Sequence, residues 1–460
     1  MMNNSAIETL VADQRAYFRT NATLPVEGRR AALIRLQKAI QAREGDIAAA
    51  LHADLGKSRE EAYLCETGMV LAEIRHMLRH IGRYAREKTV PTPLHQFAAR
   101  SFTMKRPYGV TLIMSPWNYP FLLTMDPLIG AIAAGNTCVV KPSAYAPATS
   151  AIIRELVEGC FPREHAAVIL GGRAENQALL DQKFDKIFFT GGEAVGREVL
   201  RHAAENLTPC VLELGGKSPV IVDERADIPL AARRIAFGKL LNAGQTCVAP
   251  DYVLVHESVH GEFVAALKAE FTRQCGENAL ENAAFPHIVN EKHFRRVLGL
   301  INPEKVVCGG KSDAETLRIQ PTILDGASPD DAAMQEEIFG PVLPVIKVDS
   351  LDAAIGFVRS RPTPLALYLF TADRAVKRRV LSEIPFGGGC VNDAVIHLAS
   401  SHLPFGGLGA SGMGHYHGQY SFDCFSHTAG VVDKANWLDL PMRYTPYKKV
   451  WMKVIRLFLR

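Results

Sequence analysis

The sequence predicts an α/β fold with two sheet domains. Short apolar runs that end in Pro or Gly alternate with amphipathic stretches, which is the pattern of parallel strands connected by helices. This alternation occurs in two series, one starting at Gly109 and one at Asp251. The chain of 460 residues also exceeds the length that a single hydrophobic core usually serves. We therefore expect two packed α/β domains, with the change between them near Glu213.

The individual elements follow the same patterns. Residues 5–90 place apolar and charged side chains at helical spacing, so we expect a helical opening segment. Short apolar runs bounded by turn residues predict the strands. These runs are 109–114, 136–141, 166–172, 185–192 and 218–223 in the first series, and 251–256, 305–310, 341–348 and 365–370 in the second.

Composition excludes several classes of protein. The apolar fraction of 48% and the charged fraction of 22% are typical of a globular chain and exclude a disordered or fibrous one. A net charge of +4 over this length argues against a nucleic-acid partner. The nine cysteines are scattered without a C-x-x-C pair, and no H-E-x-x-H motif occurs, so we expect no metal and a reducing compartment. Because no secretion signal or membrane-spanning run is found, we expect a cytoplasmic protein.

A glycine-rich turn follows one predicted strand. Thr190, Gly191 and Gly192 close the strand, and Gly196 precedes a helical stretch over 197–206. The free N–H groups at the start of such a helix suit an anionic phosphate. Because the spacing is not G-x-G-x-x-G, the turn alone predicts simple chain reversal equally well.

One cysteine differs in context from the other eight. A helical pattern over 229–241 breaks at Gly244, and Cys247 follows in the loop. A lone cysteine is usually a small buried apolar residue, which is our interpretation of the other eight. A loop position favours the exposure that a nucleophilic thiol requires. We therefore expect Cys247 to be the reactive cysteine.

Six motifs, in their order along the chain, resemble those of the aldehyde dehydrogenase superfamily. They are P-W-N-Y-P at 116–120, L-E-L-G-G-K at 212–217, G-Q-T-C at 244–247, E-E-I-F-G-P at 336–341, L-P-F-G-G at 403–407 and S-G-M-G-x-Y-H-G at 411–418. The last two motifs, together with the short N-terminal segment, resemble the class 3 branch, which includes fatty and aromatic aldehyde dehydrogenases. The resemblance covers residues 10–445.

This resemblance implies three structural parts and a homodimer. They are a Rossmann-like cofactor domain, an α/β catalytic domain and a small β-ribbon that bridges subunits. The implied ranges are 1–84 and 105–212 for the NAD(P)-binding domain, 213–397 for the catalytic domain, 85–104 and 398–445 for the bridging segment, and 446–460 for a basic tail.

The resemblance also implies the catalytic residues. Aldehyde oxidation needs a nucleophile that adds to the carbonyl, and Cys247 takes this role through a thiohemiacetal and a thioester. The side-chain amide of Asn118 is then the donor to the developing alkoxide, and Glu213 is the base that activates the deacylating water. Taken singly, Asn118 fits a structural turn residue and Glu213 fits a partner of a surface cation.

NAD and/or NADP is the implied cofactor. The resemblance places Lys141 at the adenosine ribose, Glu337 at the nicotinamide ribose and Phe339 beside it. The other implied cofactor contacts are Ser115, Trp117, Thr190, Gly191, Gly192, Gly196, Leu214 and Gly215. Tyr119 and Phe405 are expected to line an apolar tunnel for medium- or long-chain aliphatic, or aromatic, aldehydes.

The chain departs from many NAD-preferring relatives at one position. These carry glutamate three residues after the lysine of K-P-S, where its carboxylate accepts bonds from the ribose hydroxyls and repels a 2′-phosphate. Here the position is Ala144. The missing charge predicts that NADP is used as well as NAD. Gly192 also replaces a more usual serine, which removes one hydroxyl contact to the phosphates.

The segment 447–460 carries five basic residues and no acidic one. On a helix its apolar and basic side chains separate, which is typical of a helix that lies on a membrane surface. The apolar face would equally suit packing on the same subunit or on a dimer partner, so both alternatives stay open. The apolar set is Trp451, Val454, Ile455 and Phe458, and the basic set is Lys449, Lys453, Arg456 and Arg460.

Two rival functions fit part of the pattern. An acyl-transferring or acyl-phosphate-reducing relative would use the same thioester, but Glu213 argues against it because a water-activating base serves only hydrolysis. A non-catalytic cofactor-binding scaffold has no chemical need for Cys247, Asn118 and Glu213 together.

Overall fold

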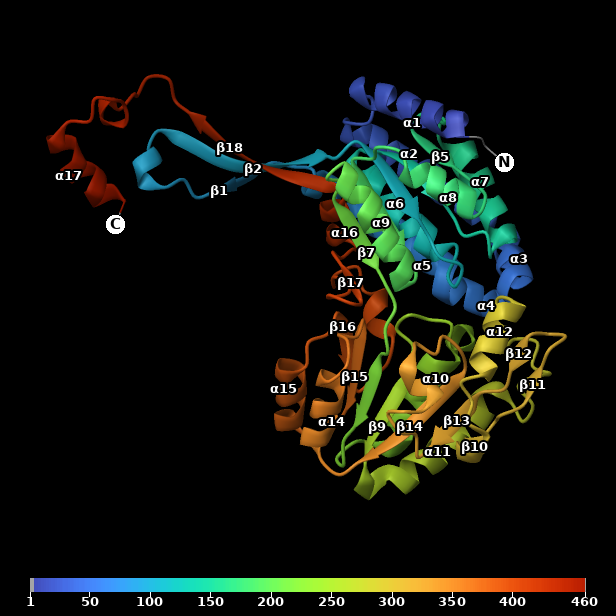
Figure 1. Ribbon diagram of the computed structural model, residues 1–460. Coiled ribbons are helices and arrows are strands. Elements are labelled where there is room, and N and C mark those ends of the chain that lie inside the picture. Colours follow the sequence, from blue (N-terminus) through green and yellow to red (C-terminus); the bar gives the residue numbers. More distant parts are fainter. Residues whose placement is uncertain (1–3, 460) are drawn as a thin grey trace.

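The opening segment is helical, as predicted, and its helices pack beside the first sheet (Figure 1). In this computed structural model, residues 4–459 are described. Helix α5 packs against α2 and α6, which ties the opening segment to the sheet domain. The elements are α1 (Asn4–Arg19), α2 (Val26–Ala42), α3 (Glu44–Leu55), α4 (Arg59–Ala62), the π-helix η1 (Tyr63–Thr67) and α5 (Gly68–Tyr84).

The first sheet is Rossmann-like and has the order β17-β7-β6-β3-β4-β5. All its pairings are parallel except that of β17 with β7. Strands β3, β4 and β6 are buried along their whole length because helices cover both faces, which explains their continuous apolar runs. The elements are β3 (Val110–Met114), α6 (Leu122–Ala134), β4 (Thr137–Lys141), α7 (Pro147–Cys160), β5 (Ala166–Val168), α8 (Arg173–Leu180), β6 (Lys186–Thr190), α9 (Glu193–Glu205), β7 (Cys210–Glu213) and β17 (Gly412–Met413).

The second sheet forms the other lobe, with the order β10-β13-β14-β9-β8-β15-β16. Only its edge pair, β10 with β13, is antiparallel. Its strands are β8 (Pro219–Val222), β9 (Tyr252–His256), β10 (Val306–Cys308), β13 (Thr322–Asp325), β14 (Val342–Val348), β15 (Ala366–Phe370) and β16 (Gly388–Val391), with a hairpin of β11 (Ser312–Asp313) and β12 (Arg318–Ile319). Its helices are α10 (Ile228–Leu240), η3 (Leu241–Gly244), η4 (Glu257–Val259), α11 (His260–Cys275), α12 (Glu291–Leu298), η5 (Pro303–Lys305), α13 (Ala332–Gln335), α14 (Leu351–Arg359), α15 (Arg374–Glu383) and η6 (Ile396–Ala399).

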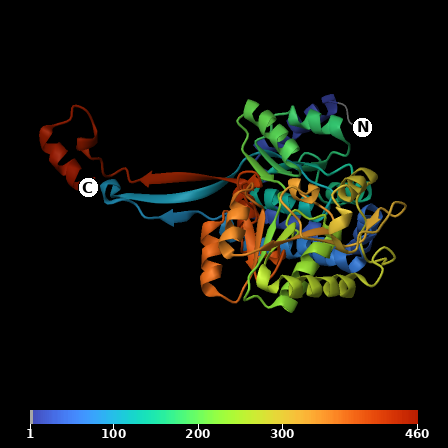
Figure 2. The same cartoon turned by 60° about the horizontal axis from the view of Figure 1, so that its bottom comes forward.

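A three-stranded arm projects from the two lobes and ends in helix α17 (Figures 1 and 2). Strand β18 pairs antiparallel with β2 along nine residues, and β1 pairs with the other edge of β2. The arm consists of β1 (Lys88–Val90), η2 (Leu94–Gln96), β2 (Ala99–Pro107), β18 (Ser426–Lys434), η7 (Pro441–Arg443) and α17 (Lys449–Phe458).

The expected bridging segment 398–445 is divided between the arm and the body. Strand β17 pairs with β7 inside the first sheet, and α16 (Gln419–Cys424) packs on α6. The chain therefore enters the arm only at β18, because the preceding residues, such as Phe422 and Phe425, are buried in the body. Arg460 and the side chain of Phe458, both part of the predicted amphipathic pattern, lie outside the described part of the structure. Within residues 4–459, no helix has the length and apolarity needed to cross a bilayer.

Candidate active site

The Cys247 loop begins with an unusual backbone turn after α10. Asn242, Ala243 and Gly244 follow one another with φ of 51°, 51° and 73°, all in the left-handed region. A side chain at Gly244 would bring its Cβ to 2.2 Å from the carbonyl oxygen of Gly340, so only glycine fits there. Left-handed non-glycine residues cost of order 1 to 3 kcal/mol each and persist only where the surroundings hold them. This turn carries the chain directly to Cys247.

The W-N-Y-P loop after β3 is joined to the Cys247 loop by side-chain amides. Asn118 Nδ2 donates to the carbonyl oxygen of Gln245 at 3.0 Å. Asn242 Nδ2 donates to the same oxygen at 3.1 Å and to the carbonyl oxygen of Asn118 at 2.7 Å. Since an amide nitrogen carries two hydrogens, Asn118 keeps a second donor for a ligand.

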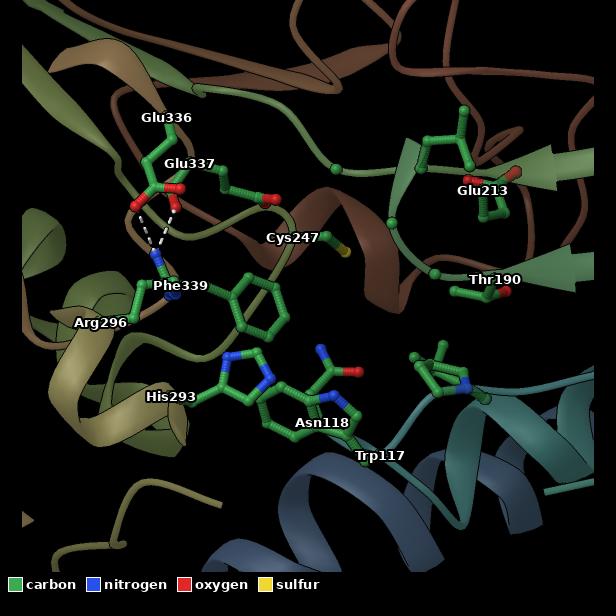
Figure 3. Close-up of a pocket in the computed structure, with 16 residues that line it drawn as sticks. Trp117, Asn118, Thr190, Glu213, Cys247, His293, Arg296, Glu336, Glu337 and Phe339 are labelled. Atoms are coloured by element: carbon green, nitrogen blue, oxygen red, sulfur yellow. Dashed lines mark hydrogen bonds and ion pairs between the residues drawn. The ribbon is translucent and has the colours of Figure 1, made fainter. Parts of the chain in front are cut away.

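The two loops face a cavity of about 300 Å³ between the lobes. In Figure 3 the Cys247 side chain points into this space, with Asn118, Glu213 and Glu337 around it. The site thus combines a thiol, an amide donor and three carboxyl groups. The lining residues are Pro116, Trp117, Asn118, Leu123, Thr190, Gly191, Gly192, Glu213, Leu214, Gly215, Cys247, His293, Arg296, Glu336, Glu337 and Phe339.

Burial raises the pKa values of three titratable groups of the cavity, Cys247, Glu213 and Glu337. Desolvation raises the pKa of the Cys247 thiol, and the nearby Glu337 and Glu213 carboxylates raise it further. Desolvation alone raises the pKa of Glu213 well above its usual range, and neither of its oxygens has a hydrogen-bond partner. The pKa of Glu337 rises to about 8, first through burial and then through Asp251. Raised pKa values of this kind are typical of groups that transfer protons in catalysis, so they favour a functional role for this cavity.

The other side of the cavity has the features of a dinucleotide site. Helix α9 begins at Gly192, whose missing Cβ would meet nothing within 4 Å, so its N-terminus is open to an anion. The hydroxyl of Thr190 and one oxygen of Glu337 are buried without partners. Lys141 lies at the end of β4, and burial lowers its pKa to about 8. An anionic, hydroxyl-rich ligand such as NAD or NADP would satisfy these groups, so the residues present fit the cofactor.

Most of the predicted site residues line this cavity, and five do not. Ser115 is hydrogen-bonded to Thr124 at 2.6 Å behind the loop. Gly196 lies against Leu214, where an added Cβ would approach to 2.7 Å, so it lets α9 pack closely on β7. The remaining three are also buried: Lys141 donates to the carbonyl oxygen of Pro142 at 2.8 Å, Tyr119 bonds the Thr246 hydroxyl at 2.6 Å, and Phe405 stacks on His417 at 5.3 Å.

Two lining residues from α12 were not predicted. Arg296 donates to the carbonyl oxygens of Glu337 and Ile338 at 3.2 and 2.7 Å and lies 3.3 Å from the Glu336 carboxylate. His293 packs on Trp117, with ring centroids 5.2 Å apart (Figure 3). The sequence of a short, highly charged helix is typical of a helix exposed to solvent. The residues that Arg296 contacts lie about forty positions further along the chain. No local signal identifies such residues.

Comparison with known proteins decides the family. The model of the aldehyde dehydrogenase family matches residues 1–431. The chain belongs to the aldehyde dehydrogenase family. The predicted resemblance and the α/β fold with its Rossmann-like domain are thereby confirmed.

Among the described residues, no group of three or more His, Cys, Asp or Glu side chains is arranged to hold a metal ion.

Several aldehyde dehydrogenases align with nearly the whole chain. The 4,4'-diaponeurosporen-aldehyde dehydrogenase of Staphylococcus aureus is 47% identical, and the match covers 99% of both chains. The dimeric NADP-preferring aldehyde dehydrogenase of Canis lupus familiaris is 41% identical over 96% of this chain and 98% of its own. Other relatives, including one from Mus musculus at 43% identity over 92% of this chain and 87% of its own, are members of aldehyde dehydrogenase family 3.

A solved structure of a Staphylococcus aureus AldH in a substrate-bound state has the same fold. Its TM-score is 0.97 at 47% identity, and the match covers 100% of both chains. This agreement extends over both lobes and the arm. The chain is thus an aldehyde dehydrogenase in family and in fold.

Proposed function

We propose that this chain oxidises medium- or long-chain aliphatic, or aromatic, aldehydes to carboxylic acids with NAD or NADP. One observation carries the proposal. Cys247, Asn118 and Glu213, which lie on three different loops or strands, converge on one cavity beside an open helix N-terminus. A thiol, an oxyanion donor and a base are the three groups that oxidation through a thioester requires.

The roles follow from position and charge. Cys247 Sγ forms the thiohemiacetal, while the free hydrogen of the Asn118 amide and the backbone N–H of Cys247 stabilise the oxyanion. Bound NAD or NADP would supply the hydride acceptor. Glu213, once ionised, removes a proton from the water that hydrolyses the thioester. Its unpartnered oxygens leave it free to accept that proton.

The cofactor would be held by the residues that fit it. Gly191, Gly192 and the α9 N-terminus would receive the phosphates, and Lys141 and Glu337 the two ribose groups. Ala144 places no carboxylate near the adenosine ribose, which supports use of NADP. The name of the NADP-preferring canine relative supports this choice.

The substrate class rests on apolar neighbours and on relatives. Leu123 lines the cavity, whereas Tyr119 and Phe405 are buried and do not line it. The name of the Staphylococcus relative indicates a long conjugated apolar aldehyde, so 4,4'-diaponeurosporenal belongs in the substrate panel. We propose a preference for apolar over charged aldehydes.

Absorbance of the reduced cofactor provides the test. We expect turnover of hexanal, decanal, benzaldehyde and 4,4'-diaponeurosporenal with NAD and with NADP. The Cys247→Ala variant should lose roughly 10⁶-fold in kcat, which is about what removal of a catalytic nucleophile costs. A Cys138→Ala variant, which alters a fully buried cysteine outside the cavity, is the matched control. Turnover by Cys247→Ala at the level of this control would refute the proposal.

We propose in addition that the arm makes a homodimer. Three apolar side chains of the arm are largely exposed: Leu94 at 71%, Phe97 at 61% and Val432 at 52%. Apolar side chains that are exposed together indicate a surface that contacts another protein chain. Helix α17 exposes Val450 and Leu457 as well, and we assign its apolar face to the partner subunit. Light scattering should show a dimer that Phe97→Asp with Val432→Asp converts to monomers.

Membrane attachment of α17 is the alternative outcome. Lys449, Lys453 and Arg456 give this helix a basic side that suits anionic lipids. Flotation with anionic vesicles separates the two assignments, because only membrane binding makes full-length protein float while protein ending at 446 does not.

We place the protein in the cytoplasm, which the nine free cysteines support.

We also propose residue ranges for the three structural parts. We propose 1–84 and 105–212 for the cofactor domain and 213–397 for the catalytic domain. The bridging part is proposed as 85–104 with 398–445, of which the projecting portion starts at β18.

A further inference from the structure

An ion pair is fully buried behind the Asn118 loop. Lys57 and Glu66 are both 0% exposed, and Lys57 Nζ lies 2.5 Å from Glu66 Oε1. Removing two charges from water costs solvation free energy that their attraction often fails to recover, and apolar residues of similar volume frequently stabilise a fold as well. Stability alone is therefore a weak reason for this pair, so its other contacts are informative.

Both members of the pair hold the W-N-Y-P loop. Lys57 Nζ donates to the carbonyl oxygen of Asn118 at 2.9 Å and lies 4.0 Å from the centre of the Tyr119 ring. Glu66 Oε2 accepts from the backbone N–H groups of Phe121 and Leu122 at 2.8 and 3.1 Å. The cation thus fixes the residue that carries the amide, and the carboxylate fixes the start of the helix that follows it.

A second carboxylate on the same segment holds the Cys247 loop. Glu61 Oε1 accepts from the backbone N–H of Asn242 at 2.7 Å, at the first of the three left-handed residues. Asn242 Nδ2 in turn reaches the carbonyl oxygen of Asn118 at 2.7 Å. That oxygen therefore accepts from Lys57 and from Asn242, one donor from each side.

A π-helix, η1, forms part of the segment that reaches both loops. Glu61 lies in α4, and Glu66 lies in η1. Such π-turns frequently occur at functional sites. The segment 57–66 thus contacts the Asn118 loop and the Cys247 loop together.

We propose that Lys57, Glu66 and Glu61 form a positioning clamp that keeps the Asn118 amide in register with the Cys247 thiol. The clamp touches neither the cavity nor the cofactor side, since none of the three lines it. It rests on the proposed role of Asn118 as oxyanion donor. Its effect is to fix the donor relative to the nucleophile, where a displacement of about 1 Å costs about 10²-fold in rate.

The test removes the pair without leaving a charge unpaired. In Lys57→Met/Glu66→Gln both charges are lost, and the glutamine oxygen still accepts from the Phe121 N–H. We expect the single-turnover rate of cofactor reduction to fall roughly ten- to a hundredfold, while KM for NADP changes less than twofold. The control is Lys305→Met/Asp331→Asn, which removes a partly buried lysine–carboxylate pair at 2.6 Å outside the site. Thermal unfolding of each variant confirms that it is folded.

A double-mutant cycle with Asn118→Ala separates positioning from general damage. If the clamp acts through Asn118, adding Lys57→Met/Glu66→Gln to Asn118→Ala should cause no further loss of the single-turnover rate. Where Asn118→Ala itself lowers the rate, an additive loss would overturn the clamp. An unchanged rate in Lys57→Met/Glu66→Gln would overturn it as well.

Alkylation of Cys247 by iodoacetamide, with Cys247→Ala as the blank, gives a readout that needs no turnover. We expect the alkylation rate to change several-fold in Lys57→Met/Glu66→Gln and in Glu61→Leu, which removes the acceptor of the Asn242 N–H, but not in the control. If alkylation changes while Asn118→Ala keeps its full hydride rate, the oxyanion assignment fails and the clamp stands. If alkylation is unchanged in both variants, the clamp fails whatever Asn118 does.

Discussion

The two walls of the cavity differ in how their polar groups are paired. On the nucleophile wall, Asn118, Asn242 and Gln245 join the two loops by hydrogen bonds, and buried charges brace them from behind. On the opposite wall, Thr190, Glu213 and Glu337 leave buried oxygens without partners. An unpartnered buried group costs about 1 to 3 kcal/mol. On the nucleophile wall Asn242 Oδ1 also lacks a partner, so the protein bears most of this cost, but not all of it, on the opposite wall. The difference teaches that one wall is preorganised for chemistry and the other awaits ligands that complete it.

Among changes that leave the Cys247 nucleophile in place, the largest effect should come from the wall with unpartnered oxygens. Glu213→Gln removes the base but keeps the shape, so steady-state turnover should fall roughly 10²- to 10⁴-fold. One equivalent of reduced cofactor per Cys247 should still form in a rapid burst, because acylation does not use this base. Stopped-flow absorbance measures both phases. Steady-state turnover equal to that of the parent would end the assignment of Glu213.

The same residue predicts the direction of the pH profile. Burial raises the pKa of Glu213 well above its usual range, so the carboxyl is protonated and inactive as a base at low pH. Parent turnover should therefore rise with pH through and above neutrality and level off once Glu213 is ionised. In Glu213→Gln, where hydroxide must replace the base, turnover should be lower and should rise with pH without levelling off. A profile that falls from pH 6 to 9 would contradict this.

A smaller loss should come from the paired wall. Asn118→Ala removes one oxyanion donor and should lower the acylation rate by about 10²- to 10³-fold. Unlike Glu213→Gln, it should abolish the burst rather than the steady state alone. Asn118→Asp, which has the same shape but lacks the donor, serves as the matched variant. A normal burst in either variant would show that the wall is organised for something other than the oxyanion.

Cofactor choice should change more modestly. Ala144→Glu introduces a carboxylate where a 2′-phosphate would lie, and like charges in that position should lower kcat/KM for NADP by roughly tenfold or more, equivalent to about 1.4 kcal/mol. Values for NAD should stay within a few-fold. The ratio of kcat/KM for the two cofactors measures the effect, with Ala144→Gln as the uncharged control. Equal ratios in all three proteins would remove the electrostatic explanation.

The smallest effect concerns stability. Because the folded-state pKa of Glu213 is raised, the native protein holds this proton more tightly than the unfolded chain, and stability is lost as pH rises above the unfolded value. Glu213→Gln should therefore match the parent at pH 4 and exceed its Tm by a few degrees at pH 8. Thermal unfolding at the two pH values checks this. A variant less stable than its parent at pH 8 would mean that Glu213 has a charged partner.

Much of the fold could be predicted because its strands are buried on both faces. This burial requires continuous apolar runs such as 137–141 and 186–190, and these runs can be recognised in the sequence alone. The division of 398–445 between arm and body was not predicted. The two-residue strand β17 has no apolar period of its own, and its pairing with β7 is a contact about two hundred residues apart.

The site divides in the same way. Cys247, Asn118 and Glu213 lie in motifs whose order identifies them, and the structure brings them to one cavity. Lys57 and Glu66 lie in a charged stretch of sequence, and charged side chains are mostly exposed. Their contacts with the Asn118 loop join residues more than fifty positions apart, and no local pattern identifies such partners.

The left-handed turn before Cys247 also restricts which substitutions its residues can tolerate. Ala243 is buried and adopts φ of 51°, so a glycine there would relieve steric strain of about 1 to 2 kcal/mol but lose a similar amount through the greater freedom of the unfolded chain. Alanine and glycine are thus near-neutral alternatives at this position, whereas valine or threonine would crowd the backbone. Asn242 has no such freedom, because its amide is already in use on both loops.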